Sequence, residues 1–446
     1  MRVGLLALAC LLACCVRAPA GTTTPTPHVY LVIVDGLDPR LVTRERMPRF
    51  FALLAELPER SSFFPGAQAV MPARTNPNHV TLLTGVYADV HGITGNAYWS
   101  RQRDASPQKL EAAALIEVET LFTVAEETRP SLATLGAFGK PKLARLFASV
   151  PGRQHAPDVL WSAEDLPRGR REPATGYASD ADTMAAALAK MAATEPDLAV
   201  LNLADVDSAG HGRGPESPEC ARAVTAADAA LGSLVDDLRA RGRWERAVLI
   251  VTADHGMASL APTPERPRPV ISLGPGLRRT GVLAVAEGGV EHVYAGGAPD
   301  VAPDLAGAAR LAAATPGVTE VLSRVPVPGV PAIAERHPDW HLDHDRAGDL
   351  LLVAARGWQF VDPFDPVDAA LLGNHGGPGE LAVPLLVTGG WPGLTHGTGD
   401  APGLVDVAPT IAVLLDLRRP RRLDGSAVSP EGAGRPIAAV LGQRPH

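Results

Sequence analysis

Five stretches of the chain consist almost entirely of aliphatic and β-branched residues, and they end in small or polar residues. They are HVYLVIVDG (28–36), DLAVLNLADVD (197–207), AVLIVTADHG (247–256), GDLLLVAA (348–355) and VPLLVTGG (383–390). Continuous apolar runs of this length predict strands that are buried on both faces, as in a parallel sheet. Amphipathic stretches at 118–128, 181–193, 219–241 and 404–417 predict helices between these strands. The alternation predicts an α/β fold with a doubly wound sheet flanked by helices.

Residues 257–345 interrupt this pattern. They are rich in proline and glycine, as in PTPERPRP and VPVPGVP, and their apolar runs are short. We interpret them as a smaller α+β subdomain inserted into one catalytic domain that covers residues 28–446.

The N-terminus has the order of a secretory signal. Arg2 precedes an apolar run over residues 3–16, which is followed by Ala18-Pro19-Ala20. We expect a signal peptide at 1–20 and a short tether at 21–27. Cleavage after Ala20 would give a periplasmic or secreted bacterial protein. Alternatively, LLAC at 11–14 resembles a lipobox, and Cys14 would carry a lipid anchor.

Composition narrows the partners and the cross-links. The net charge is −8 and no basic run occurs, so we expect no nucleic acid as a macromolecular partner. Three of the four cysteines lie in the leader, which leaves Cys220 alone and excludes an intrachain disulfide in the processed chain. Only four lysines occur, and two of them stand together as Lys140 and Lys142.

Four short motifs carry metal-type side chains, and three of them follow predicted strands. Carboxyl ends of strands meet at one edge of an α/β sheet, so these side chains can converge. Three carboxylates and three imidazoles suffice for two divalent ions such as zinc, and a hydroxyl completes the set. Singly, each residue is equally explained as a helix cap or a loop residue; together they predict a two-metal phosphoryl hydrolase. The residues are Asp35 (VIVDG), Asp207 and His211 (DSAGH), Asp254 and His255 (ADHG), His375 (GNHGG) and Thr75 (ARTNPNH).

Two longer segments carry a family resemblance. MPARTNPNHVTLLTGVYADVHGITGNAYW (71–99) is similar to the nucleophile loop and phosphate-binding segment of the nucleotide pyrophosphatase/phosphodiesterase branch of the alkaline phosphatase superfamily. NLADVDSAGHGRGP (202–215) resembles the metal motif of that family. The resemblance extends over most of the chain after the leader and implies an alkaline-phosphatase-like fold.

The resemblance also implies roles for single residues. Thr75 would be the nucleophile, forming a phosphothreonine intermediate, and Asn96 would hold a phosphoryl oxygen. The backbone N–H of Asn76, if this residue opens a helix, would donate to the same oxygen. One zinc would be bound by Asp35, Asp254, His255 and Thr75, and the other by Asp207, His211 and His375; manganese or iron are alternatives. We expect Asp38, His79 and Asp205 to cap or position these residues and not to react.

The substrate is less well defined by the sequence. Asn76 stands where nucleotide-cleaving members typically have an aromatic residue that stacks on a base. TNPN (75–78) and GKPKL (139–143) also resemble phosphonoacetate hydrolase, which cleaves a C–P bond. In that case Lys140 and Lys142 would grip a substrate carboxylate or a terminal phosphate; otherwise they lie on the surface. The remaining alternative is an exported binding protein that has lost turnover.

Overall fold

The structure is a computed structural model that describes residues 25–101, 106–151, 156–264, 269–296, 301–361 and 371–442. The predicted signal peptide, Cys14 and most of the tether lie outside the described residues. Within the described ranges, no helix is both long enough and apolar enough to cross a membrane.

The larger sheet has seven strands among the described residues. Five neighbouring strands are parallel, and the other two are antiparallel at one edge. The run at 383–390, which we expected to be like the parallel strands, is one of these two. In spatial order the strands are β2 (Ser62–Gln68), β17 (Ala382–Thr388), β8 (Ala247–Thr252), β1 (His28–Val34), β7 (Leu198–Leu203), β5 (Thr134–Phe138) and β6 (Val159–Ser162).

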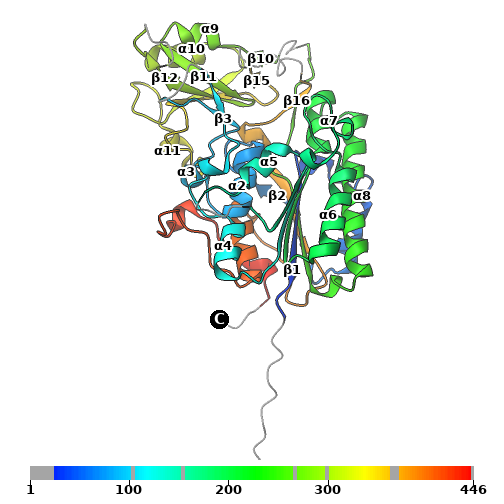
Figure 1. The fold of residues 1–446 in the computed structure, drawn as a ribbon. Coiled ribbons are helices and arrows are strands. Elements are labelled where there is room, and N and C mark those ends of the chain that lie inside the picture. Colours follow the sequence, from blue (N-terminus) through cyan, green and yellow to red (C-terminus); the bar gives the residue numbers. More distant parts are fainter. Residues whose placement is uncertain are drawn as a thin grey trace, which may run out of the picture.

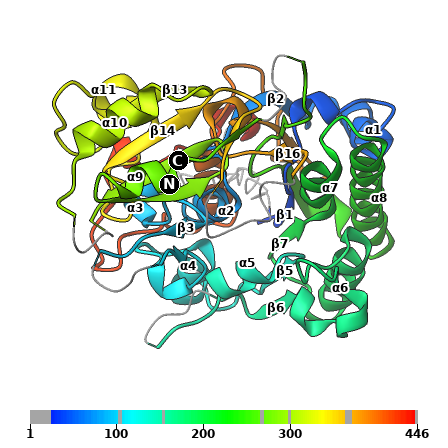
Figure 2. The ribbon, with the colours of Figure 1, turned by 90° about the horizontal axis from the view of Figure 1, so that it is seen from above.

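Helices cover both faces of this sheet, so the predicted doubly wound α/β architecture is confirmed (Figures 1 and 2). One layer contains α1 (Pro48–Glu56), α6 (Asp180–Thr194), α7 (Asp205–Arg213) and α8 (Pro218–Ala240). The other contains α2 (Thr75–Thr84), α4 (Leu121–Thr128), α5 (Pro141–Leu146) and α12 (Val407–Leu414). The four predicted helices are α4, α6, α8 and α12. Serine side chains cap the two longest helices, because Ser179 accepts from the N–H of Asp182 and Ser217 from that of Cys220.

A smaller antiparallel sheet lies beyond the carboxyl ends of β1, β7 and β8 (Figure 1). Its order is β11 (Val282–Glu287), β12 (Val290–Ala295), β14 (Leu350–Ala354) and β13 (Val318–Ser323). Two helices, α9 (Gly274–Arg278) and α10 (Leu305–Ala313), pack on it. The sheet extends past residue 345, where we placed the end of the insert, and the insertion itself stays a prediction.

The run at 348–355 is β14 of this smaller sheet and not a strand of the parallel sheet. Its apolar pattern is continuous because both of its faces are buried. Leu350 and Leu352 pack in the core of the smaller sheet, whereas Leu351 and Val353 pack with Met71 of the larger part. Burial on both faces therefore gives the same sequence pattern in either type of sheet.

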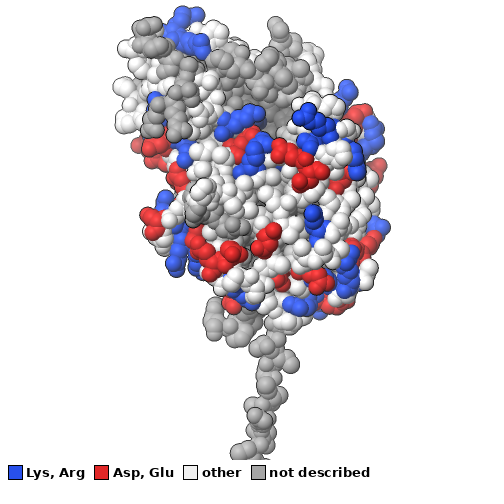
Figure 3. All heavy atoms as spheres, in the orientation of Figure 1, with Lys and Arg blue, Asp and Glu red and all other residues white. Residues whose placement is uncertain are grey.

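The remaining elements are short. The helices α3 (Ala88–His91) and α11 (Ile333–Arg336) have one turn each. Three two-stranded ladders are formed by β3 (Ala97–Tyr98) with β4 (Gln108–Lys109), β16 (Gly373–Asn374) with β9 (Ala258–Ser259), and β10 (Val270–Ile271) with β15 (Gln359–Phe360). Charged side chains of both signs are interspersed over the face seen in Figure 3.

Candidate metal centre and nucleophile

Three aspartates meet at the carboxyl edge of the parallel sheet. Asp35 follows β1 directly, Asp254 comes two residues after β8, and Asp207 lies in the first turn of α7 after β7. The strand register aligns these ends, because Ile33 of β1 faces both Asn202 of β7 and Thr252 of β8. All three carboxylates are buried.

Three histidines turn the same ring nitrogen toward these carboxylates. The Nδ1 atoms of His211, His255 and His375 lie 2.8, 3.0 and 2.6 Å from the backbone oxygens of residues 373, 256 and 73. A carbonyl oxygen only accepts, so each Nδ1 carries the proton and each neutral ring presents Nε2 as a lone pair. This orientation is typical of metal-binding histidines.

The geometry between these groups fits metal ions. Nε2 of His211 and of His375 lie 3.3 and 3.6 Å from Asp207 Oδ1. Nε2 of His255 lies 3.3 Å from Asp254 Oδ2 and 3.5 Å from Asp35 Oδ1. Lone pairs thus face lone pairs, which is unfavourable unless a cation lies between them. Consistently, Asp207 Oδ1 and Asp254 Oδ2 are buried without a hydrogen-bond partner in the described part of the chain.

Burial favours the metal-binding form of two of these histidines. It lowers the pKa of His255, and it lowers that of His375, which also lies beside His255, well below its usual range. Both rings stay neutral, as metal ligation requires. Burial raises the pKa of Asp35, and the neighbouring Asp254 carboxylate adds to this effect. For Asp207, burial opposes ionisation, but the Lys140 ammonium and His211 outweigh it and hold the pKa well below the usual range.

Thr75 is the first residue of α2, directly after the extended Arg74. Its hydroxyl oxygen lies 3.5 Å from His255 Nε2, and the side chain is buried. A hydroxyl at a helix N-terminus lies where backbone N–H groups and the helix dipole favour an anion. The structure therefore brings the hydroxyl and all six predicted metal-type residues into one site.

The phosphate-binding pair differs from the expectation in one respect. Asn76 lies within α2 as expected, but its backbone N–H donates to the side-chain oxygen of Asn96 at 3.0 Å. The Asn76 side chain donates to the backbone oxygen of Leu110. The N–H of Asn76 is thus engaged by Asn96 and positions that side chain. Because the Asn96 oxygen accepts this bond, its NH₂ group is left as a donor.

Lys140 does not lie on the surface. Its Nζ lies 2.7 Å from Asp35 Oδ1 and 2.6 Å from Asp207 Oδ2, and the side chain is buried. It therefore joins one carboxylate of each predicted zinc set and neutralises part of their charge. Lys142 is half-buried nearby, and burial together with Lys140 lowers its pKa to about 8. Substrate binding by either lysine stays a prediction.

Two supporting residues complete the site. Asn202 donates to Asp35 Oδ2 at 2.9 Å and was missed by the sequence analysis, although a lone asparagine in the apolar strand LAVLNL is a signal. His79 places Nδ1 2.9 Å from the backbone oxygen of Thr75 and Nε2 3.2 Å from Asn202. His79 also forms a candidate metal-binding group with Asp35 and Asp254. Since both of its ring nitrogens have protein partners, we interpret His79 as positioning Thr75.

Comparison with known proteins decides the family. The chain matches the type I phosphodiesterase/nucleotide pyrophosphatase family over residues 29–378. It belongs to that family. The type I phosphodiesterases and nucleotide pyrophosphatases are metal-dependent hydrolases, so the chain is a hydrolase of phosphoric esters.

Individual relatives agree with this assignment. The chain is 25% identical over 413 residues to human ectonucleotide pyrophosphatase/phosphodiesterase family member 5, covering 88% of this chain and 71% of that protein. The murine member 5, solved as an inactive threonine-to-alanine variant with AMP, has a TM-score of 0.68 at 24% identity and covers 88% of this chain and 96% of its own. Phosphonoacetate hydrolase from Sinorhizobium meliloti, solved with phosphonoformate, has a TM-score of 0.63 at 21% identity, covering 86% and 95%. The fold is alkaline-phosphatase-like.

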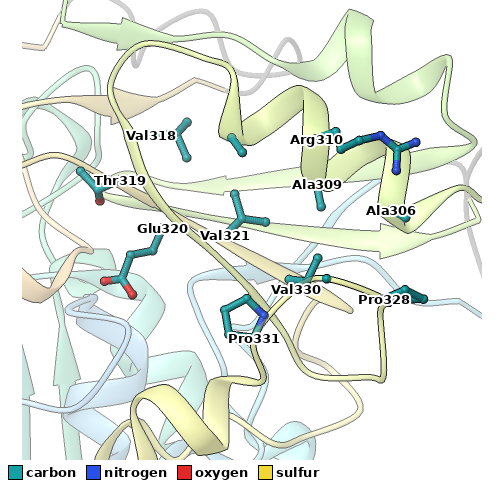
Figure 4. Close-up of a pocket in the computed structure, with 12 residues that line it drawn as sticks. Ala306, Ala309, Arg310, Val318, Thr319, Glu320, Val321, Pro328, Val330 and Pro331 are labelled. Atoms are coloured by element: carbon teal, nitrogen blue, oxygen red, sulfur yellow. The ribbon is translucent and has the colours of Figure 1, made fainter.

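Cavities occur beside the site and away from it. A cavity of about 200 Å³ adjoins His375 and is also lined by Arg356 and Trp358. A groove of about 460 Å³ lies between α10, β13 and residues 328–331 of the smaller sheet (Figure 4). None of the candidate site residues lines that groove, so we do not assign it to the reaction.

Proposed function

We propose that the chain is an exported two-zinc phosphodiesterase of the nucleotide pyrophosphatase type that acts through a phosphothreonine intermediate. The observation that carries this proposal is the convergence of three unprotonated imidazole nitrogens and three carboxylates around one buried hydroxyl. One donor set is Asp35, Asp254 and His255 with Thr75, and the other is Asp207, His211 and His375.

The donor chemistry favours zinc, because imidazole nitrogens and carboxylate oxygens are its common ligands, although manganese and iron accept similar sets. Divalent cations bound there would supply Lewis acidity, which lowers the pKa of a nearby hydroxyl and stabilises charge on phosphoryl and leaving oxygens. Three aspartates carry more negative charge than the single Lys140 ammonium neutralises, which supports binding of further cations.

The chain's own residues provide the nucleophile and the oxygen-binding group. Thr75 Oγ1, after giving its proton to water, forms a bond to phosphorus while the bond to the leaving oxygen breaks and that oxygen takes a proton from water. The free NH₂ group of Asn96 donates to a phosphoryl oxygen. A water molecule then attacks the threonine phosphate, which restores the Thr75 hydroxyl and releases a phosphate monoester.

The substrate class rests on the comparisons and on the lysines. Family membership favours a phosphodiester or a nucleotide pyrophosphate, and the murine relative binds AMP. A second candidate is C–P cleavage of a phosphonocarboxylate, because Lys140 and Lys142 both lie at the site and the Sinorhizobium enzyme binds phosphonoformate. An inactive binding protein is the weakest alternative, since every predicted ligand and the nucleophile are present and brought together.

A substrate comparison on one zinc-loaded preparation tests this proposal. We expect bis-p-nitrophenyl phosphate to be hydrolysed with a higher kcat/KM than p-nitrophenyl phosphate or phosphonoacetate. A clear preference for phosphonoacetate would replace the diester assignment by the C–P alternative. Absence of hydrolysis of all three would contradict the enzyme assignment in both forms.

Export is supported by the leader-like sequence of residues 1–20. Mass spectrometry of the chain recovered from bacterial membranes and periplasm tests it. An N-terminus at Gly21 is the expected product of signal cleavage, whereas a lipid-modified Cys14 indicates a lipoprotein. A cytoplasmic chain that retains Met1 or Arg2 contradicts export.

A further inference from the structure

The turn between β11 and β12 of the smaller sheet reaches the catalytic loops. It consists of Gly288 and Gly289, and Glu287 pairs with Val290 across it. The N–H of Gly289 donates to the backbone oxygen of His375 at 3.1 Å. A Cβ atom on Gly288 would lie 1.9 Å from that same oxygen. Only a turn without side chains can approach the His375 loop this closely.

Glu287, the last residue of β11, is buried at 1% exposure and points into the larger part of the molecule. Its Oε1 accepts a hydrogen bond from the backbone N–H of Ala97 at 2.7 Å. Its Oε2 forms an ion pair with Nε of Arg74 at 2.9 Å. A buried carboxylate is costly unless it is paired, so these contacts fix its position.

Each partner of Glu287 is next to a residue with a proposed role in the reaction. Ala97 follows Asn96, and Arg74 precedes Thr75. Arg74 also donates from Nη1 to the side-chain oxygen of Asn374 at 3.3 Å, and that oxygen accepts the N–H of His375 at 2.9 Å. One carboxylate from the smaller sheet therefore connects the nucleophile, the phosphoryl-oxygen donor and a predicted metal ligand.

We propose that Glu287 is a positioning residue, which holds the Asn96 loop against the start of α2 so that the Asn96 amide and the Thr75 hydroxyl address the same phosphoryl group. This inference rests on the proposed function, because it assigns Glu287 to the geometry of that reaction. It also gives the smaller sheet a part in catalysis through contacts that reach the site from outside the parallel sheet.

A double-mutant cycle with Asn96 tests the proposal. Glu287→Ala is expected to lower kcat by about 10²-fold, in the range seen when one oxyanion donor is lost, with KM changed less than about threefold. Asn96→Ala is expected to lower kcat at least as much. If Glu287 acts through Asn96, the double variant loses no more than about threefold beyond Asn96→Ala alone. A role in general stability would instead give losses that multiply.

Asp349→Asn is the matched control. Asp349 is also a buried carboxylate of the smaller sheet region, and it ties that region to Arg101 at 2.7 Å without contacting the site. We expect its kcat to stay within about threefold of the wild type. If Glu287→Ala does not fold, Glu287→Gln serves, since its amide oxygen still accepts from Ala97 while the ion pair with Arg74 is lost. An intermediate loss of about 10-fold in kcat is then expected.

The outcomes separate this inference from the proposed function. Wild-type activity in Asn96→Ala contradicts the proposed function itself. Loss in Asn96→Ala combined with full activity in Glu287→Ala, or with multiplying losses in the double variant, overturns only the role of Glu287. A loss in Asp349→Asn as large as that in Glu287→Ala also overturns it, because any carboxylate linking the two parts would then suffice.

Discussion

Replacement of Asn96 by aspartate or by alanine separates the two functions of its side-chain amide. The amide oxygen accepts from the N–H of Asn76 at 3.0 Å, and the NH₂ group is the proposed donor to phosphate. Asn96→Asp keeps an oxygen acceptor for Asn76 and has nearly the same shape. It loses the donor and adds a negative charge beside the phosphoryl group. Asn96→Ala loses the donor and the acceptor but adds no charge.

The expected losses follow from these differences. Loss of one preorganised donor to a developing oxyanion lowers kcat by about 10²–10³-fold, and this applies to both variants. The added carboxylate at ~4 Å from a phosphoryl oxygen costs up to about 4 kcal/mol more at an effective dielectric constant of about 20, which is close to a further 10³-fold. Asn96→Asp is therefore predicted to be the less active variant, although it is the more conservative one structurally.

Steady-state kinetics with bis-p-nitrophenyl phosphate and thermal unfolding of the same preparations measure the two effects. We expect Asn96→Asp to keep a Tm close to that of the wild type, because the hydrogen bond from Asn76 is retained. Greater activity in Asn96→Asp than in Asn96→Ala would refute the reasoning, since the amide would then act only by holding Asn76.

Three further variants test other parts of the site and of the core. Gly288→Ala places a Cβ 1.9 Å from the His375 backbone oxygen at a φ of +67°, so metal content and Tm should both fall; Gly425→Ala, with a φ of +83° and open space, should cost only about 1 kcal/mol of backbone strain. Lys140→Met leaves two buried carboxylates without their ammonium partner, so Tm should fall more in EDTA than with saturating zinc, and equal losses would contradict this. Burial lowers the pKa of His91 to about 3, so the unfolded chain binds this proton below about pH 6.5 while the folded chain does not. Stability is lost as pH falls through that window, and His91→Gln should reduce the loss in unfolding free energy between pH 6 and pH 4, an effect on the order of 3 kcal/mol; an unchanged pH dependence in chemical denaturation would contradict it.

The sequence was sufficient for the features that depend on local pattern. Apolar runs ending in Asp35 and Asp254 predicted both the strands and the edge of the sheet at which the carboxylates meet. The short motifs around Thr75 and His375 then predicted which side chains converge, and the structure brings them together.

The features that were missed depend on contacts between distant segments. β14 has the same apolar pattern as a parallel strand because two different cores bury its two faces. Lys140 was equally compatible with the surface, and only the packing of α5 against β1 and α7 places its ammonium between Asp35 and Asp207. Glu287 stands in an ordinary-looking turn sequence, and its role follows from contacts 213 residues away with Arg74 and 190 residues away with Ala97.

The most direct test of the central claim is a paired measurement of turnover and metal content in Thr75→Ala. The account predicts that turnover of bis-p-nitrophenyl phosphate is abolished while zinc content, measured by inductively coupled plasma mass spectrometry, stays near two ions per chain. The other six donor residues remain in this variant, so the metal sites should survive loss of the hydroxyl. Activity of more than a small percentage of the wild type would contradict a covalent phosphothreonine intermediate.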